Sequence, residues 1–246
     1  MVVLSDKFHL IAPDYPGFGF SAFPGKNNFE YSFENISAYI NKFTDKIALK
    51  TFTIYLHDYG CPIGLRICMN HPEKIDRIIV QNGNAYLEGI EGIWDEIREY
   101  WEHPTEEKKQ SLYAFLSKDG TKMQYTAGVP EELLTRVSPE TWLLDWERMS
   151  RPGNIDRQYE LNCTYKSNIE MFPAFQEYFR IHQPPALIIW GKYDPYFSVN
   201  EAYCYKKDIP NAQVHIIDGS HMLLETNFDE VLDLITLFLH TGVSFR

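Results

Sequence analysis

Cysteine is scarce in this chain, and long apolar runs are absent. The 246 residues include 4 cysteines, at positions 61, 68, 163 and 204. None of them forms the C-x-x-C pair that is typical of redox or zinc sites. No apolar run approaches the roughly 20 residues of a transmembrane helix, and no secretory signal is recognisable at the start. These absences favour a reduced, soluble, cytoplasmic protein.

Positive charge is also in deficit. Lys and Arg number 23 against 34 for Asp and Glu, which gives a net charge of -11. This balance argues against nucleic acid or an anionic membrane as a partner. Hydrophobic residues make up 44% of the chain and charged residues 23%, as in ordinary globular proteins. The length suffices for one sizeable core with an inserted segment, and the oligomeric state is left open.

The stretch around Asp58 carries the first sign of chemistry. Thr51–Leu56 is β-branched and aromatic, as in a buried strand, and Pro62 suits the first turn of a helix. A sharp turn from strand to helix lifts the residue at the turn beside free N–H groups, which is the nucleophile-elbow pattern usually written G-x-S-x-G. Asp58 occupies the nucleophile position, and Gly60 follows two residues later. Leu56 is bulkier than the small residue usual two positions before. The alternative is a buried strand and helix with an incidental aspartate.

Strand-like and helix-like segments alternate on both sides of a long helical stretch. We expect strands at residues 8–13, 51–56, 75–80, 186–190 and 214–217, and helices at 33–48, after 62, at 199–207 and at 228–239. This alternation is typical of a parallel sheet with helices on both faces. Between the two parts, aromatic and charged residues interleave at helical spacing. The sequence therefore predicts an α/β core, residues 1–83 and 184–246, with a helical insertion at residues 84–183.

Two more polar residues follow predicted strands. Asp194 comes after the Gly191-Lys192-Tyr193 turn, and His221 comes after Asp218-Gly219-Ser220. The carboxyl ends of parallel strands open on one edge of the sheet, where ligands bind. Asp58, Asp194 and His221 should therefore converge there in the order nucleophile, acid, histidine. Each residue alone is more often a turn, cap or structural residue, but the three in this order favour a catalytic site.

These segments carry a family resemblance. Residues 14–21, 57–60, 190–194 and 219–221 resemble the epoxide hydrolase and haloalkane dehalogenase branch of the α/β-hydrolase fold. The acidic elbow is the specific part, because esterases have serine there. The resemblance implies an α/β-hydrolase fold with an inserted cap and no cofactor or metal. Asn82 stands where some dehalogenases keep the triad acid, and its amide leaves Asp194 as the better candidate.

The resemblance implies a two-step hydrolysis of a small-molecule substrate. The carboxylate of Asp58 attacks an sp3 carbon and forms an alkyl-enzyme ester. His221, oriented by Asp194, activates a water that cleaves the ester. Backbone N–H groups, including that of Tyr59, would hold the oxyanion.

The leaving group distinguishes the substrates. An epoxide oxygen needs a proton, which cap tyrosines supply in epoxide hydrolases, and the possible donors here are Tyr125 and Tyr165. Phe172 stands about where the second tyrosine of the family would fall. A halide needs N–H donors, often from a Trp directly after the nucleophile, and Tyr59 at that position argues against it. An epoxide hydrolase is therefore the first expectation, and ordinary aromatic packing is the alternative role for both tyrosines.

The family resemblance also predicts that the N-terminal part is shortened. Family members carry further strands before the Phe8–Pro13 segment, with a His-Gly motif that supplies a second oxyanion N–H. We therefore expect either direct pairing of residues 8–12 with 53–56 or a vacancy between them, and impaired activity. A haloalkane or haloacid dehalogenase and a non-catalytic or truncated ligand-binding homologue are the alternative functions.

Overall fold

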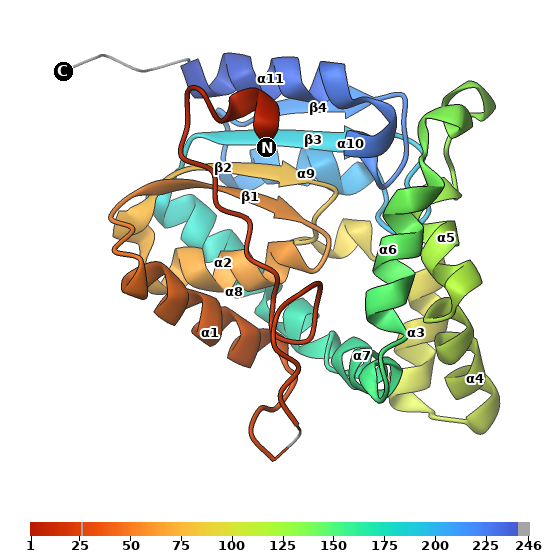
Figure 1. Ribbon diagram of the computed structural model, residues 1–246. Helices are drawn as coiled ribbons and strands as arrows, with labels where there is room; N and C mark the ends of the chain where they lie inside the picture. Colours follow the sequence, from red (N-terminus) through yellow and green to blue (C-terminus); the bar gives the residue numbers. More distant parts are fainter. Residues whose placement is uncertain (26, 241–246) are drawn as a thin grey trace.

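The computed structural model describes residues 1–25 and 27–240, and a four-stranded sheet lies at its centre (Figure 1). The strands are β1 (Phe52–His57), β2 (Ile75–Gln81), β3 (Ala186–Gly191) and β4 (Gln213–Ile217). Their order along the sheet is β1-β2-β3-β4, and each neighbouring pair is parallel. This confirms the predicted α/β class and parallel sheet. Each of these strands begins and ends within one residue of its predicted range.

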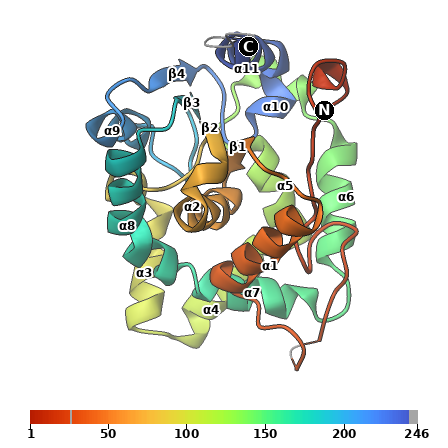
Figure 2. The ribbon, with the colours of Figure 1, turned by 90° about the vertical axis from the view of Figure 1, so that its left-hand side faces the viewer.

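Helices pack on both faces of the sheet (Figures 1 and 2). One face carries α1 (Phe33–Lys46), α2 (Gly60–Asn70), α8 (Lys166–His182) and α9 (Asn200–Asp208), and the other carries α10 (Leu223–Thr226) and α11 (Phe228–His240). Strand β2 shows how the sequence divides the core. Ile78 and Val80 join the cluster with α1 and α2, whereas Ile79 joins the cluster with α11. Successive strand residues point to opposite faces, so a continuous apolar run serves both layers.

Residues 82–185 are mostly helical and, throughout that described range, contain no strand. Besides α8, this range contains α3 (Ile93–Glu102), α4 (Glu106–Phe115), α5 (Lys118–Thr126), α6 (Pro139–Met149) and α7 (Asn154–Cys163). It also contains 3-10 helices at Leu87–Gly89 and Glu131–Arg136. In Figure 1 the strand arrowheads point toward α3 to α7. These helices therefore lie at the carboxyl edge of the sheet, where Asp58, Asp194 and His221 were predicted to meet.

Hydrogen bonds join the helical segment to loops of the core. Trp94 Nε1 on α3 donates to the carbonyl of Tyr196 at 2.7 Å, and Ser220 Oγ donates to the carbonyl of Ala127 at 2.6 Å. Gly128, with φ of +70°, follows α5, and a Cβ there would lie 2.0 Å from the carbonyl oxygen of Tyr193. The chain after α5 can approach the core this closely only because position 128 has no side chain.

The predicted first strand is wrong. Residues 8–13 form an irregular segment, and within the described residues β1 pairs with β2 alone. No backbone hydrogen bond joins residues 9–13 to β1 in the described chain, so of the two alternatives direct pairing is excluded. Strand propensity reflects packing on a half-buried sheet, and His9, Ile11 and Ala12 are exposed instead. Without a neighbouring strand, propensity alone does not fix an extended ladder.

The remaining sequence expectations have a defined place in the structure. The predicted segment 184–246 is described as far as His240, and residues 241–246 lie outside the described residues. All four cysteines are free thiols. Among the helices of the described residues, none combines the length and apolar character needed to cross a bilayer.

Candidate active site

Asp58 sits at a sharp turn between β1 and α2. Its φ is +46°, a left-handed backbone conformation that residues other than glycine rarely adopt. The Asp58 N–H donates to the carbonyl of Asn82 at 3.1 Å, and the Cys61 N–H donates back to the Asp58 carbonyl at 2.9 Å. The backbone is therefore held on both sides of Asp58. Such a strained turn presents the side chain outside the sheet, as in a nucleophile elbow.

The bulky Leu56 is accommodated by Gly64 on α2. A Cβ at position 64 would lie 2.2 Å from Leu56 Cδ2 and 3.0 Å from Ile54 Cδ1. The helix can therefore lie close to β1 even though position 56 carries a leucine. The small residue that is usual two before the nucleophile is replaced here by a small residue on the helix opposite.

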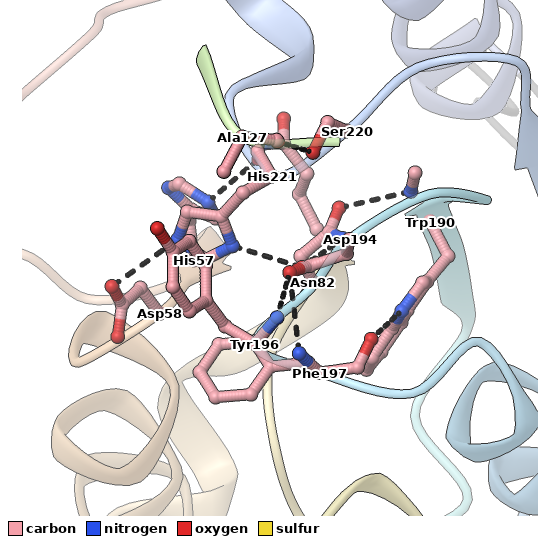
Figure 3. A network of polar contacts seen from close by, with 12 residues as sticks. His57, Asp58, Asn82, Ala127, Trp190, Asp194, Tyr196, Phe197, Ser220 and His221 are labelled. Atoms are coloured by element: carbon pink, nitrogen blue, oxygen red, sulfur yellow. Dashed lines mark hydrogen bonds and ion pairs between the residues drawn. The ribbon is translucent and has the colours of Figure 1, made fainter. Parts of the chain in front are cut away.

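Asp58, His221 and Asp194 form one chain of hydrogen bonds (Figure 3). His221 Nε2 lies 3.2 Å from Asp58 Oδ2, and His221 Nδ1 lies 2.9 Å from Asp194 Oδ2. The imidazole thus stands between two carboxylates, each at the end of a different strand. The structure brings together the three residues that the sequence predicted at this edge.

The two carboxylates set the charge of the imidazole. Burial alone would lower the pKa of His221, but the charges and hydrogen bonds of Asp194 and Asp58 outweigh it and raise the pKa to about 10. Burial raises the pKa of the Asp58 carboxyl, yet the hydrogen bond and charge of His221 and the backbone N–H of Tyr59 hold it below its usual value. At neutral pH His221 is therefore an imidazolium that faces the ionised Asp58.

Besides His221, two backbone N–H groups and one side-chain amide donate hydrogen bonds to the carboxylate of Asp194. Its Oδ1 accepts the backbone N–H groups of Tyr196 at 2.7 Å and Phe197 at 3.2 Å. Its Oδ2 accepts Asn82 Nδ2 at 2.6 Å, while Asn82 Oδ1 accepts the Gly191 N–H at 3.1 Å. Asn82 is fully buried and has φ of +42°. The Asn82 amide therefore orients the carboxylate of Asp194. Position 82 itself supplies no acid.

His57 is a second histidine in the site that sequence reasoning did not assign. Its ring lies 4.7 Å from the His221 ring, centroid to centroid, and its Nε2 lies 3.2 Å from the His221 carbonyl oxygen. Gln81 Nε2 donates to the same carbonyl at 3.2 Å. Burial and the charge of His221 lower the pKa of His57 to about 4, so this ring stays neutral. Its place directly before Asp58 was the only signal in the sequence.

The site opens into a cavity of about 800 Å³ between the core and the helical segment. The Asp58 side chain is 32% exposed and the His221 side chain 2%. The turn at Asp14–Gly19 and helices α3 to α7 contribute most of the remaining wall. One polar face comes from α7, where Asn154, Gln158 and Asn162 follow one another at helical spacing and are all buried. The cavity is large enough for a small organic substrate.

The predicted tyrosines lie in different surroundings. Tyr59 lines the cavity, and its hydroxyl accepts Asn162 Nδ2 at 3.3 Å. Tyr125 also lines the cavity, and its hydroxyl donates to Asp145. Tyr165 is 1% exposed, packs against Tyr59, and is absent from the cavity wall, so it is misplaced for a proton donor.

Titratable groups elsewhere do not gather into a metal centre. Among residues 1–25 and 27–240, no group of three or more His, Cys, Asp and Glu side chains is arranged to hold an ion. The chemistry that the site offers on its own residues is a carboxylate, a histidine and hydroxyl groups.

A sharp turn holding an acidic residue, with His221 and Asp194 behind it at the edge of a parallel sheet, defines a hydrolase-type site. In agreement, residues 2–228 match the model of a family described as the alpha/beta hydrolase fold. The chain belongs to the α/β-hydrolase fold family. It is 36% identical over 241 residues to the uncharacterized hydrolase YNR064C of Saccharomyces cerevisiae, which covers 96% of this chain and 82% of that protein.

Other similar proteins are more distant in sequence. A cis-3-alkyl-4-alkyloxetan-2-one decarboxylase of Shewanella oneidensis is 24% identical to this chain. The alignment covers 96% of this chain and 75% of the decarboxylase. Among solved structures, a mutant epoxide hydrolase from Bacillus megaterium aligns with a TM-score of 0.66 and 18% identity, over 97% of this chain and 86% of that one. At this identity the likeness shows the fold alone.

Proposed function

We propose that this hydrolase opens epoxides by a covalent mechanism in which Asp58 is the nucleophile. One observation carries the proposal. An aspartate, in place of serine, occupies a strained elbow, faces a cavity, and lies within hydrogen-bond reach of His221. An ionised carboxylate needs no base to attack an sp3 carbon, whereas a serine would form an acyl-enzyme from an ester.

In the first step an Asp58 oxygen attacks an epoxide carbon, and the carbon–oxygen bond of the ring breaks. This step converts the Asp58 carboxylate to a neutral ester. The attraction that Asp58 exerts on the His221 proton is then lost, so the pKa of His221 falls. The imidazole can give up its proton and become the base that the second step requires.

In the second step neutral His221 takes a proton from water, and the hydroxide attacks the ester carbonyl. Asp194 stabilises the imidazolium that forms, and the Tyr59 N–H supports the oxyanion. Collapse of this intermediate releases a diol and regenerates the Asp58 carboxylate. In this proposal residues 84–183 serve as a cap that closes the cavity over Asp58.

The oxygen that leaves carbon needs a proton from the cavity wall. Of the two tyrosines predicted as donors, only Tyr125 lines the cavity, and its hydroxyl is engaged with Asp145. A halide would instead need N–H donors, and the residue after the nucleophile is Tyr59. This disfavours the dehalogenase alternative. The oxetan-2-one in the name of the Shewanella relative is another strained oxygen ring, so such a lactone is a suitable second probe.

The test is to trap the ester. The His221→Gln variant, incubated with styrene oxide, should gain the mass of one epoxide molecule on the peptide that contains Asp58. The unaltered protein should produce the diol without a stable adduct, and Asp58→Asn should form none.

Absence of both turnover and adduct with styrene oxide, a bromoalkane and an oxetan-2-one would refute the enzymatic proposal. Tight binding of a probe under those conditions would support the non-catalytic alternative. An adduct from the bromoalkane alone would support a dehalogenase.

A further inference from the structure

Tyr196 lines the active-site cavity and carries a buried hydroxyl that has no hydrogen-bond partner among the described residues. It follows Asp194 by two residues, and its ring packs edge-on against His221 with 5.3 Å between ring centroids (Figure 3). The residue is 8% exposed. A buried hydroxyl without a partner is energetically unfavourable. Such a hydroxyl on a residue that lines a cavity is suited to donate to a ligand.

The backbone fixes this side chain in place. The Tyr196 N–H donates to Asp194 Oδ1 at 2.7 Å, and its carbonyl accepts Trp94 Nε1 at 2.7 Å. One contact ties it to the triad and the other to α3. The ring is further held against His221. The hydroxyl is therefore presented by a rigid part of the site, as a catalytic donor requires.

The other tyrosine hydroxyls of the cavity are less suitable. The Tyr125 hydroxyl donates to Asp145, that of Tyr100 shares a hydrogen bond with Tyr159, and that of Tyr59 accepts from Asn162 on α7. Tyr15 lies beside the start of α2, where its hydroxyl is 3.6 Å from the position of a Cβ on Gly60. That is the side of the Tyr59 N–H and of the oxyanion. Among residues 1–25 and 27–240, Tyr196 alone combines a buried hydroxyl without a hydrogen-bond partner and ring contact with His221.

We propose that the Tyr196 hydroxyl is the acid that protonates the oxygen leaving the substrate carbon in the first step. The inference rests on the proposed function. As Asp58 forms its bond to carbon, the carbon–oxygen bond of the epoxide breaks, and its electron pair takes the Tyr196 proton. The products are a hydroxyalkyl ester and a phenolate. The His221 imidazolium then returns a proton to the phenolate and becomes the neutral base of the second step.

The electrostatics of the site agree with this sequence. Burial raises the pKa of Tyr196, and the charges of Asp194 and Asp58 raise it further, so the hydroxyl is protonated in the resting protein. Esterification of Asp58 removes one of these charges. Tyr196 therefore becomes a stronger acid as the ester forms, when the leaving oxygen needs its proton.

The experiment measures ester formation alone. In a His221→Gln background, the rate of adduct formation with styrene oxide is followed by intact mass spectrometry over a range of concentrations. Adding Tyr196→Phe should lower the maximal rate by about 100-fold or more, the usual contribution of a general acid, and change the half-saturating concentration by less than about threefold. The matched control is Tyr113→Phe, which removes a tyrosine hydroxyl that donates to Asp156 outside the cavity and should leave both values within about threefold.

The outcomes separate the two proposals. A Tyr196→Phe variant that forms adduct within about threefold of the parent rate overturns the role of Tyr196, while the parent adduct still supports Asp58 as nucleophile. The role of Tyr196 is also overturned if Tyr125→Phe lowers the maximal rate of adduct formation by about 100-fold and Tyr196→Phe does not. A rise in half-saturation at an unchanged maximal rate assigns Tyr196 to binding and also overturns the proposal. No adduct in the parent refutes the proposed function itself, and this inference with it.

Discussion

The charge state of His221 makes the stability of this protein depend on pH in a specific window. The pKa of the histidine is about 10 in the folded protein, against 6.5 for an unperturbed histidine side chain. The folded state therefore binds the proton more tightly than the unfolded state. The resulting stabilisation is fully present below pH 6.5 and is lost as the pH rises toward 10.

The two pKa values fix the size of this effect. Each unit of difference corresponds to about 1.4 kcal/mol, so the histidine contributes at most about 5 kcal/mol. Between pH 7 and pH 9 the contribution should fall by about 2.5 kcal/mol. Because the Asp58 side chain is 32% exposed, solvent screening makes these figures upper limits.

The assay is urea denaturation of the unaltered protein and of His221→Gln at several values between pH 6 and pH 9. Glutamine does not titrate, so the difference between the two unfolding free energies isolates the histidine from other groups. This difference should decrease steadily with rising pH. A difference that stays constant from pH 7 to pH 9 would show that His221 is neutral in the resting protein and would refute the imidazolium assignment.

Three further changes test the elbow and the triad. Gly64→Ala places a Cβ 2.2 Å from Leu56 Cδ2, which should cost about 1–3 kcal/mol of unfolding free energy. Combined with Leu56→Ala, it should cost less than the sum of the single changes in urea denaturation, and strict additivity would contradict the contact. Asn82→Gly keeps the positive φ but removes the 2.6 Å hydrogen bond to Asp194. Its loss should slow ester hydrolysis by about 10- to 100-fold, so that adduct accumulates in mass spectra; diol production at the original rate would count against this role. Asp58→Ser should abolish epoxide turnover measured as diol, and undiminished turnover would mean that another group attacks.

The parallel sheet and the meeting point of the polar residues were predictable because both depend on local pattern. Buried β-branched runs mark β1 to β4 wherever they stand in the chain. Parallel pairing then forces the ends of β1, β3 and β4 onto one edge. Asp58, Asp194 and His221 follow these strands directly, so their proximity required no knowledge of side-chain packing.

Features set by contacts between distant segments were not predictable. The sequence gives Tyr125, Tyr165 and Tyr196 the same chemistry, and only the fold pairs the first, buries the second and leaves the hydroxyl of the third free. The strand predicted at residues 8–13 is absent for a related reason, because strand propensity takes effect only beside a neighbouring strand. The neutral state of His57 likewise depends on its burial against His221.

The attachment of the helical segment has a consequence for the reacting groups. Its contacts from Trp94, Ala127 and Gly128 all end on the loops that carry Tyr196, Ser220 and Tyr193, next to the triad. Lifting this end as a rigid lid would break two hydrogen bonds and shift the loops of Asp194 and His221. Exchanging these helices for others would therefore alter the reacting groups as well as the shape of the cavity.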